Sequence, residues 1–443
     1  MTGPLDWTLD TVAAATRGVV DGDPTMRVGA VSTDSRSISR GALFVAIKGE
    51  HHDGHDFAAP AMTAGAVASV VVRGSGLDVR PRVEVEDTGD ALIDLAAHRR
   101  GELTAKVAAI TGSTGKTSTK NLLAAALPGS WSSPRSFNNE VGVPLTVLSA
   151  PGDVGSLVIE VGSRGLGHIR RLAPATMPDV AVITNLGVVH LETFGTTDAL
   201  ADGKFELAEA LGEGGVAVLP DDEPRLARPH PGRTITFGRG LDADVRVTDL
   251  AVDERGRPRF FLHATGRSVP VELALAGGHN ALNAAAAAGA ALVLGQDLED
   301  IAVGLASASG SSWRMEVHEG RFTVVNDAYN ANPDSMMAAL QTVAAMPGKR
   351  IAVLGEMAEL GPATEQEHVR IGQVANRLGF AVITVGSDHG LAKAADGRNV
   401  TGQTEALQLA LDEADEGSIV LVKASRSVGL EQLAARLIEE AGA

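Results

Sequence analysis

Short runs of β-branched and other apolar residues alternate along this chain with longer stretches rich in Ala and Leu. Apolar runs of about four to eight residues are typical of buried strands, and the longer stretches are typical of helices. Strands and helices that alternate in this order predict an α/β protein with mostly parallel sheets. Because 443 residues exceed what one hydrophobic core normally serves, we expect several domains.

The first predicted unit covers residues 1–87. It contains candidate strands at Ala42–Ile47 and Ala68–Val72 and a polar loop rich in Gly and His at Lys48–Phe57. A predicted helix at Asp90–Arg99 links this unit to the next.

The second predicted unit covers residues 88–312 and begins with a strand. Its Ala-rich stretch Asn280–Leu294 predicts a buried helix that closes the unit. Parallel strands joined by helices usually form a doubly wound sheet, which binds ligands at the carboxyl ends of its strands. The candidate strands are Val107–Ile110, Leu157–Val161, Val180–Thr184 and Val216–Leu219.

The third predicted unit covers residues 313–443. Asn332, Pro333 and Asp334 have the form of a helix start, with a capping Asn and a Pro at the first helical position. The candidate strands are Phe322–Val325, Ile351–Leu354, Ala381–Val385 and Ile419–Val422.

A glycine-rich loop lies between the first strand of the second unit and a predicted helix at Ser118–Leu127. In this context backbone N–H groups can wrap phosphates, and the helix N-terminus adds positive potential. Lys116 would neutralise the β- and γ-phosphates and the Thr117 hydroxyl would bind Mg²⁺. The usual G-x-x-x-x-G-K-S/T form fails because Ile110 stands where its first Gly belongs, so the loop is the shorter T-G-x-x-G-K-T variant. The alternative is a Gly-rich turn that contains GKT by chance. The predicted nucleotide site comprises Gly112, Ser113, Thr114, Gly115, Lys116, Thr117 and Ser118.

Charge and composition narrow the possible functions. The fixed charges sum to −17, and a surface this acidic repels nucleic-acid backbones, so we expect no nucleic-acid partner. The chain has no Cys, which excludes disulfides, thiolate metal sites and a Cys nucleophile. It shows neither an 18-residue apolar run nor the basic and apolar regions of a signal peptide, so we expect a cytoplasmic protein without a membrane span.

Three further residues could hold or support a metal ion. Glu160 interrupts an apolar strand, where a charge is costly unless it is paired or bound to metal; the alternative is a strand-end carboxylate in water. His190 follows another strand, and an ordinary surface or core histidine is as good an interpretation. Lys204, without its context, would be a solvated helix lysine.

Together these residues resemble the Mur ligase family over nearly the whole chain. That family carries a T-G-x-x-G-K-T loop, a Glu after the next long strand, a metal-binding His and a downstream Lys modified to a carbamate by CO₂. The resemblance implies ATP and two Mg²⁺ ions, one held by Thr117 and Glu160 and the other by Glu160, His190 and carbamylated Lys204. It thus makes Lys116, Glu160, His190 and Lys204 the catalytic set.

The resemblance extends to other nucleotide and substrate contacts. It implies that Asn283 contacts adenine, that Arg314 approaches the nucleotide, and that Asp327 meets the ribose or orients Arg314. Asn138 and Asn139 resemble a loop near the muramoyl-peptide. One departure is His168, where relatives often have Glu, so we assign it no substrate role.

Two segments in the third unit, Asp327–Met336 and Val353–Gly361, resemble the family members that add D-alanyl-D-alanine. The resemblance makes Asn330 and Asn332, within the first segment, substrate-binding residues. The first unit resembles the UDP-binding domain of these ligases. Its implied substrate residues are Thr33, Asp34, Ser35, Arg36, Lys48, Gly49, His55 and Asp56. The implied fold is three α/β domains: an N-terminal UDP-binding domain, a central P-loop-type domain with a parallel sheet that binds ATP, and a C-terminal Rossmann-like domain.

The implied reaction is ATP-dependent ligation. The terminal carboxylate of UDP-N-acetylmuramoyl-tripeptide would form an acyl-phosphate, which the amine of D-alanyl-D-alanine would attack. The rivals are the neighbouring ligase that adds diaminopimelate or lysine, a folylpolyglutamate synthase, and a nucleotide-dependent switch. The segments of the first unit that resemble a UDP-binding domain argue against the synthase, and the Asp327–Met336 segment argues against the neighbouring ligase. A nucleotide-dependent switch would not require Glu160, His190 and Lys204 together. We expect a monomer.

Overall fold

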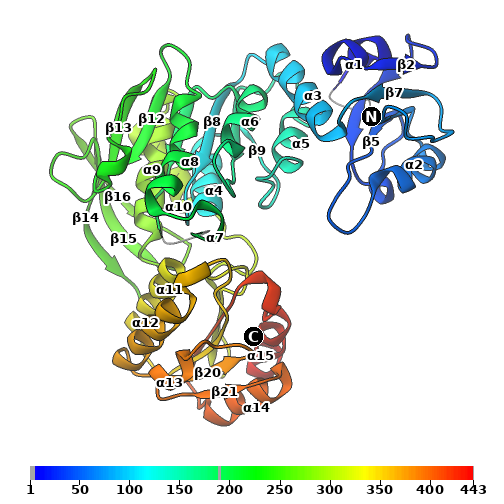
Figure 1. Cartoon of the computed structure of the whole chain (residues 1–443). Helices are drawn as coiled ribbons and strands as arrows, with labels where there is room; N and C mark the ends of the chain where they lie inside the picture. The colour runs from blue at the N-terminus through cyan, green and yellow to red at the C-terminus, as the bar shows by residue number, and fades with distance from the viewer. Residues whose placement is uncertain (1–4, 188–190, 443) are drawn as a thin grey trace.

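A computed structural model describes residues 5–187 and 191–442, which form three units built around three larger sheets (Figure 1). The first unit has a five-stranded sheet in the order β2-β7-β6-β5-β4, with a small antiparallel pair, β1 and β3, beside it. Its elements are β1 (Trp7–Thr8), α1 (Leu9–Thr16), β2 (Val19–Asp21), β3 (Arg27–Val28), β4 (Ala30–Ser32), β5 (Ala42–Val45), α2 (Ala58–Ala64), β6 (Ala68–Val72) and β7 (Arg82–Val85), with 3₁₀ turns η1 (Ser35–Ser37) and η2 (Gly54–Phe57).

Helix α3 (Thr88–Glu102) joins the first unit to the central one. Asp87 caps its N-terminus by accepting a 2.8 Å hydrogen bond from the backbone N–H of Asp90. Buried residues of α3, including Leu92 and Leu95, belong to one continuous core that extends from the first sheet to the central sheet. The link is therefore a packed helix and not a loose tether.

The central unit contains a nine-stranded sheet in the order β16-β15-β14-β13-β12-β11-β8-β10-β9, parallel from β9 through β14. The strands are β8 (Lys106–Thr111), β9 (Trp131–Ser132), β10 (Ser156–Glu160), β11 (Val180–Ile183), β12 (Val216–Pro220), β13 (Arg233–Gly238), β14 (Val245–Val252), β15 (Pro258–Ala264) and β16 (Arg267–Glu272).

Alternating residues of the central strands enter two different cores, as the pleat of a strand requires. Val107 and Ala109 of β8 face the core that holds α3, α5, α6 and α8, whereas Ala108 and Ile110 face the core of α4, α9 and α10. The helices are α4 (Lys116–Ala126), α5 (Gly142–Leu148), α6 (His168–Thr176), α7 (Leu191–Phe194), α8 (Thr197–Glu209), α9 (Asn280–Val293) and α10 (Leu298–Ser307), with a 3₁₀ turn η3 (Pro224–Leu226).

The third unit contains a six-stranded sheet in the order β17-β18-β22-β19-β20-β21, parallel except for β17. Its elements are β17 (Glu316–His318), β18 (Thr323–Asn326), α11 (Pro333–Ala345), β19 (Arg350–Gly355), α12 (Thr364–Arg377), β20 (Phe380–Val385), α13 (Leu391–Ala394), β21 (Arg398–Val400), α14 (Gln403–Glu413), β22 (Ile419–Lys423) and α15 (Glu431–Ala441), with 3₁₀ turns η4 (Gly361–Ala363) and η5 (Arg426–Val428). Helices cover both faces, with α11 and α12 over one core and α14 and α15 over the other.

The predicted strands and the helix starting after Asn332 are confirmed, with strand ends that agree to within about two residues. Two expectations need correction. Helix α4 begins at Lys116, so Lys116 and Thr117 already belong to its first turn. The antiparallel strands β15 and β16, and β14 before them, were not predicted, although β14 and β15 alternate buried and exposed residues as half-buried strands do.

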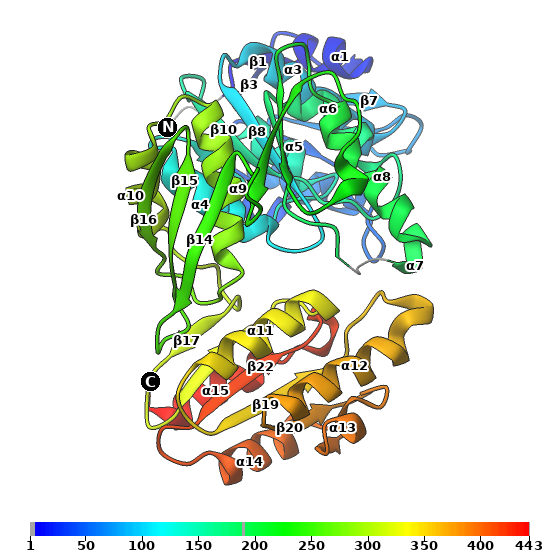
Figure 2. The same cartoon turned by 90° about the vertical axis from the view of Figure 1, so that its left-hand side faces the viewer.

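The third unit lies against the central unit, and the first unit lies beside the central unit next to α3 and α5 (Figures 1 and 2). Of the helices that the structure describes, none combines the length and the apolar character needed to cross a bilayer.

Candidate active site

The phosphate loop follows β8 and is held in shape by the end of β11. The Thr184 hydroxyl donates to the carbonyl of Thr114 at 2.5 Å, and the Asn185 side chain accepts from the N–H of Thr114 at 2.9 Å. Gly112 has φ 147°, and a Cβ there would lie 1.9 Å from the Thr184 hydroxyl oxygen. The loop therefore requires glycine at position 112 both for its backbone conformation and for space.

Lys116, at the start of α4, folds back over this loop. Its Nζ donates to the carbonyls of Gly112 at 2.6 Å and Ser113 at 3.3 Å. Desolvation lowers the pKa of Lys116; the charge of Glu160 opposes this shift and that of Arg314 adds to it. A cation beside a glycine-rich loop at a helix N-terminus is what a bound polyphosphate needs.

Glu160, at the end of β10, is buried beside the first turn of α4. Its Oε2 accepts from the Thr117 hydroxyl at 2.9 Å and its Oε1 from the Asn138 amide at 2.7 Å. Its relative exposure is 1%, so the alternative of a strand-end carboxylate in water is wrong. A buried carboxylate whose oxygens accept from a hydroxyl and an amide is suited to binding a metal ion.

The donor set fits Mg²⁺. In the described part of the chain, no group of three or more His, Asp or Glu side chains could hold a metal by itself. Mg²⁺, however, is commonly held by one or two carboxylates together with phosphate oxygens and water. Thr117 and Glu160 supply such a pair next to the phosphate loop. His190, the other predicted imidazole ligand, lies outside the described residues.

Lys204 lies on α8 and is 1% exposed, so the interpretation as a solvated helix lysine is wrong. Burial, with a smaller contribution from the charge of Lys116, lowers the pKa of Lys204 well below its usual range. Its Nζ lies 6.0 Å from the centre of the Phe194 ring. A lysine with a depressed pKa presents a neutral amine, the form that reacts with CO₂ to give a carbamate.

This buried amine should cost stability at neutral pH. An unfolded lysine titrates near 10.4, so below that pH the unfolded chain binds a proton that folded Lys204 resists. Stability is therefore lost as pH falls from about 10.4 toward the lower folded pKa. Lys204→Met, which keeps the shape without the amine, should raise the unfolding temperature in CO₂-free buffer at pH 7, by about 2–4 °C per kcal/mol recovered. The gap from the unsubstituted chain should shrink toward pH 10; equal melting temperatures at pH 7 would contradict this account.

The sequence interpretation missed a second buried lysine, Lys120, one turn after Lys116. Its Nζ donates to the carbonyls of Ser133 at 2.8 Å and Arg135 at 2.5 Å. The Ser133 hydroxyl in turn accepts from the backbone N–H of Glu160 at 3.1 Å. Lys120 thus fixes the loop that holds Glu160. The i, i+4 spacing from Lys116 was the available signal, since it places both side chains on one helix face.

The third unit contributes Arg314 to this centre. The Arg314 guanidinium lies 3.9 Å from the centre of the Tyr329 ring, and its Nη2 donates to the Ser136 hydroxyl at 3.3 Å. Ser136 also lies 3.3 Å from the Thr117 hydroxyl oxygen. Arg314 therefore reaches across the boundary between the two units to the edge of the candidate metal site.

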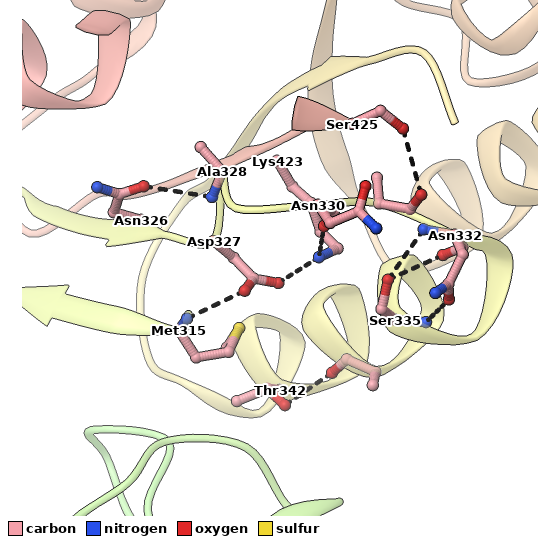
Figure 3. A network of polar contacts seen from close by, with 12 residues as sticks. Met315, Asn326, Asp327, Ala328, Asn330, Asn332, Ser335, Thr342, Lys423 and Ser425 are labelled. Carbon is pink, nitrogen blue, oxygen red and sulfur yellow. Dashed lines mark hydrogen bonds and ion pairs between the residues drawn. The ribbon is translucent and has the colours of Figure 1, made fainter. Parts of the chain in front are cut away.

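A polar network positions the segment around Arg314 (Figure 3). Asp327 accepts from the backbone N–H of Met315 at 3.1 Å and from Lys423 Nζ at 2.5 Å, and Lys423 also donates to the carbonyl of Asn330 at 2.9 Å. Asp327 thus acts on the neighbour of Arg314 and not on its guanidinium. Asn332 caps α11 through a capping box with Ser335.

Most of these residues line one cleft of about 1120 Å³ between the central and third units. Asn283 also lines it and donates to the side-chain oxygen of Asn280 at 2.8 Å. Gly112 and Lys204 are buried and do not line the cleft. The predicted residues in its lining are Ser113, Thr114, Gly115, Lys116, Thr117, Ser118, Asn138, Asn139, Glu160, Asn283, Arg314, Asp327, Asn330 and Asn332.

Asp334, which the sequence interpretation used only as part of a helix start, also lines the cleft, at the N-terminus of α11. A Cβ at Gly187 would lie 1.8 Å from Asp334 Oδ2. A larger residue at position 187 would therefore require the Asp334 side chain to move.

The predicted first-unit residues, all of which the structure describes, do not line this cleft. Asp34 accepts hydrogen bonds from the backbone and guanidinium of Arg36, and these lower the pKa of Asp34 to about 2. Thr33 precedes that pair and Ser35 lies between its two members, and Lys48, Gly49 and Asp56 are exposed. His55 lies 2.6 Å from Asp53 Oδ1 and accepts from the N–H of Val72 at 3.0 Å, so both its ring nitrogens serve the local fold.

Comparison with family models matches each unit to part of one family. The Mur ligase family catalytic domain matches residues 27–100, the Mur ligase middle domain residues 110–291, and the Mur ligase glutamate ligase domain residues 313–426. The chain therefore belongs to the Mur ligase family.

Full-length relatives and solved structures specify the type. The chain is 37% identical to a Mycobacterium tuberculosis protein over 93% of this chain and 92% of the relative, and 36% identical to an Escherichia coli protein over 93% and 94%. Both are named UDP-N-acetylmuramoyl-tripeptide–D-alanyl-D-alanine ligase. MurF from Acinetobacter baumannii superimposes with a TM-score of 0.90 at 32% identity, covering 98% of this chain and 100% of that one. MurF from Thermotoga maritima in complex with ADP gives 0.85 at 30% identity, covering 93% and 98%. This chain is a Mur ligase of the MurF type.

Proposed function

We propose that this chain uses ATP to join D-alanyl-D-alanine to the terminal carboxylate of UDP-N-acetylmuramoyl-tripeptide, forming the pentapeptide precursor of peptidoglycan. The observation that carries the proposal is the single cleft in which a phosphate loop, a buried Thr117–Glu160 pair and Arg314 of the third unit meet. The named relatives and the ADP complex of a relative support the same reaction. We propose units at 1–87, 88–312 and 313–443 for UDP, ATP and acceptor binding.

The residues of the cleft have distinct roles in this reaction. Residues 112–118 cradle the triphosphate of ATP, and Lys116 neutralises the charge that develops on the γ-phosphate as the peptide carboxylate attacks it. Arg314 adds a second cation from the third unit. The amine of the acceptor then attacks the acyl-phosphate carbonyl and phosphate leaves. Positioning supplies most of the remaining acceleration.

The implied metal and carbamate fit the residues present. Thr117 and Glu160 would hold Mg²⁺, with His190 and carbamylated Lys204 completing a second site, and bound Mg²⁺ supplies charge neutralisation at the phosphates. The Lys204 amine is buried and lowered in pKa, as carbamylation requires. Carbamylation joins the neutral amine to CO₂ and releases one proton, turning a cation into a carboxylate-like ligand.

The remaining proposals concern the substrates and the setting. Asn283 would contact adenine, Asp327 would position Arg314 through Met315, and Asn138, Asn139, Asn330 and Asn332 would meet the peptide or the acceptor. Both substrate regions belong to one chain, so we propose a monomer. UDP-linked precursors and ATP are cytoplasmic metabolites, so we propose that the reaction takes place in the cytoplasm.

The experiment combines ATP, Mg²⁺ and UDP-N-acetylmuramoyl-tripeptide, with and without D-alanyl-D-alanine. Phosphate release should depend on both peptide substrates, and mass spectrometry should find the pentapeptide. Phosphate release that does not depend on D-alanyl-D-alanine, with no new product, would contradict the ligase proposal and favour a nucleotide-dependent switch.

Arg36 tests the proposed UDP site. Its side chain is 88% exposed although Asp34 holds it in place, an arrangement suited to a phosphate ligand. Arg36→Ala should change the free energy of unfolding by less than about 0.5 kcal/mol, because surface ion pairs contribute little. The KM for the UDP substrate should rise roughly tenfold, the value of one charge-assisted contact. Arg27→Ala, which removes an exposed partner of Asp6, is the control; equal KM values for the two variants would argue against a UDP site here.

A further inference from the structure

The acceptor of the proposed reaction carries a free carboxylate that the cleft must neutralise. An extended dipeptide separates its amine from its carboxylate by roughly 7 Å. With the amine at the reacting carbonyl, the carboxylate must therefore still lie inside the cleft. The question is which cation meets it.

Among the described residues, the Lys and Arg side chains that line the cleft are Lys116, Arg164, Arg239, Arg314, Lys423 and Arg426. Lys116 caps the phosphate loop, and Arg314 reaches toward Ser136 at the metal site. Lys423 is buried and bound to Asp327. These three side chains therefore already have roles, either in nucleotide binding or in stabilising the fold.

Arg164 and Arg239 belong to the central unit. Arg164 lies in the loop before α6, beside the Glu140–His168 pair, and Arg239 follows β13. The central unit already carries the nucleotide, and the peptide enters from the first unit. The acceptor would therefore bind against the third unit. Of the cations that this unit contributes to the described cleft lining, Arg426 is the one not yet assigned a role.

The Arg426 guanidinium is held in a fixed position. It lies 4.6 Å from the centre of the Trp313 ring, and its Nη1 is 3.0 Å from Glu431 Oε1. Its side chain is still 52% exposed. A guanidinium has five N–H donors, so after the Glu431 contact a pair of N–H groups remains that can bind both oxygens of a carboxylate.

The neighbouring lining suits a small peptide. Ser425, directly before Arg426, accepts from the N–H of Ala358 at 2.8 Å and donates to the carbonyl of Ala331 at 3.3 Å. It thereby ties two cleft loops to the end of β22. Ala331, Ala338 and Ala358 line this face, and their small side chains leave room for methyl groups.

We propose that Arg426 binds the carboxylate of the acceptor and so makes the enzyme specific for a dipeptide with a free C-terminus. This inference rests on the proposed function. Arg426 acts in recognition, since it meets the end of the acceptor that does not react.

The test compares D-alanyl-D-alanine with its C-terminal amide, which lacks the negative charge. The unsubstituted enzyme should prefer the acid in kcat/KM. Arg426→Ala should lower kcat/KM for the acid roughly 30- to 100-fold, the value of a charge-assisted bidentate contact, and change the amide value less than about threefold. The KM for ATP should not move.

Two further variants distinguish a specific effect on the acceptor from a general effect of misfolding. Arg426→Lys keeps a cation for Glu431 but loses the fork, so its acid-to-amide ratio should be intermediate. Arg436→Ala, which changes an exposed side chain of α15 that does not line the cleft, should match the unsubstituted enzyme. Each ratio comes from one protein sample, so the fraction folded cancels.

An acid-to-amide ratio that Arg426→Ala leaves unchanged would overturn the assignment of Arg426. Equal losses of kcat/KM for the acid and the amide give such an unchanged ratio. A raised KM for ATP in Arg426→Ala would also overturn the assignment. If the unsubstituted enzyme releases no acceptor-dependent phosphate with either acceptor, the proposed function itself fails, which is a separate result.

Discussion

Lys116→Met should abolish ATP-dependent ligation, lowering kcat/KM roughly 10³-fold or more. Lys116 is the cation of the phosphate loop, where its Nζ donates to the carbonyls of Gly112 and Ser113. With ATP bound, it would donate to the β- and γ-phosphates instead. Removing one such charge or donor from a phosphoryl-transfer site typically costs about 10²- to 10⁵-fold. Methionine keeps the length of the stem, so the loop loses the charge and little packing. Phosphate release at saturating Mg²⁺ measures the effect.

The matched control is Lys106→Met. Lys106 begins β8, at the opposite end of the strand from the phosphate loop, and pairs with Asp179 at 2.7 Å. This exposed pair should contribute at most about 1 kcal/mol, and its loss should leave turnover unchanged. Comparable activity in the two variants would show that the phosphate loop is not the site of ATP chemistry.

Lys204→Ala should lower kcat by roughly 10³-fold, because a lost metal ligand removes several kcal/mol of charge stabilisation. The truncated side chain also leaves space in the buried site. Acetate or propionate should therefore restore part of the activity by supplying the missing carboxylate. In the unsubstituted enzyme, removal of CO₂ should lower activity and bicarbonate should restore it.

Lys204→Met is the control for this rescue, since its side chain fills the space that a small acid would occupy. It should be as inactive as Lys204→Ala and should not respond to acetate. If Lys204→Ala retained full activity, or if acetate rescued both variants equally, Lys204 would have no role as a carbamate ligand.

Most buried strands of the parallel regions were predictable from the sequence because they form continuous apolar runs, but the parallel strands β13 and β21 were not predicted. The phosphate loop could be placed for the same reason, with its strand and helix on either side. Glu160 stood out as a charge in an apolar run. The half-buried strands β14–β16 were missed, because alternating polar residues make such strands less conspicuous than apolar runs.

Residues whose roles depend on distant partners could not be found by pattern. Lys120 holds carbonyls 13 and 15 positions away, and Lys423 meets Asp327 across 96 positions. Arg426 is defined as a candidate by the surface that it shares with Trp313 and the cleft. Asn332, predicted to bind substrate, has its side chain engaged in the cap of α11, a local role that the sequence also indicated.

The central claim, ligation through an acyl-phosphate in this cleft, is tested most directly by isotope transfer. UDP-N-acetylmuramoyl-tripeptide labelled with ¹⁸O at both oxygens of its terminal carboxylate would be turned over with ATP and D-alanyl-D-alanine. Attack of that carboxylate on the γ-phosphate should leave one ¹⁸O in each released phosphate and one in the new amide of the pentapeptide. Pentapeptide formed together with unlabelled phosphate would contradict the acyl-phosphate route, and labelled substrate recovered without pentapeptide would contradict the ligase.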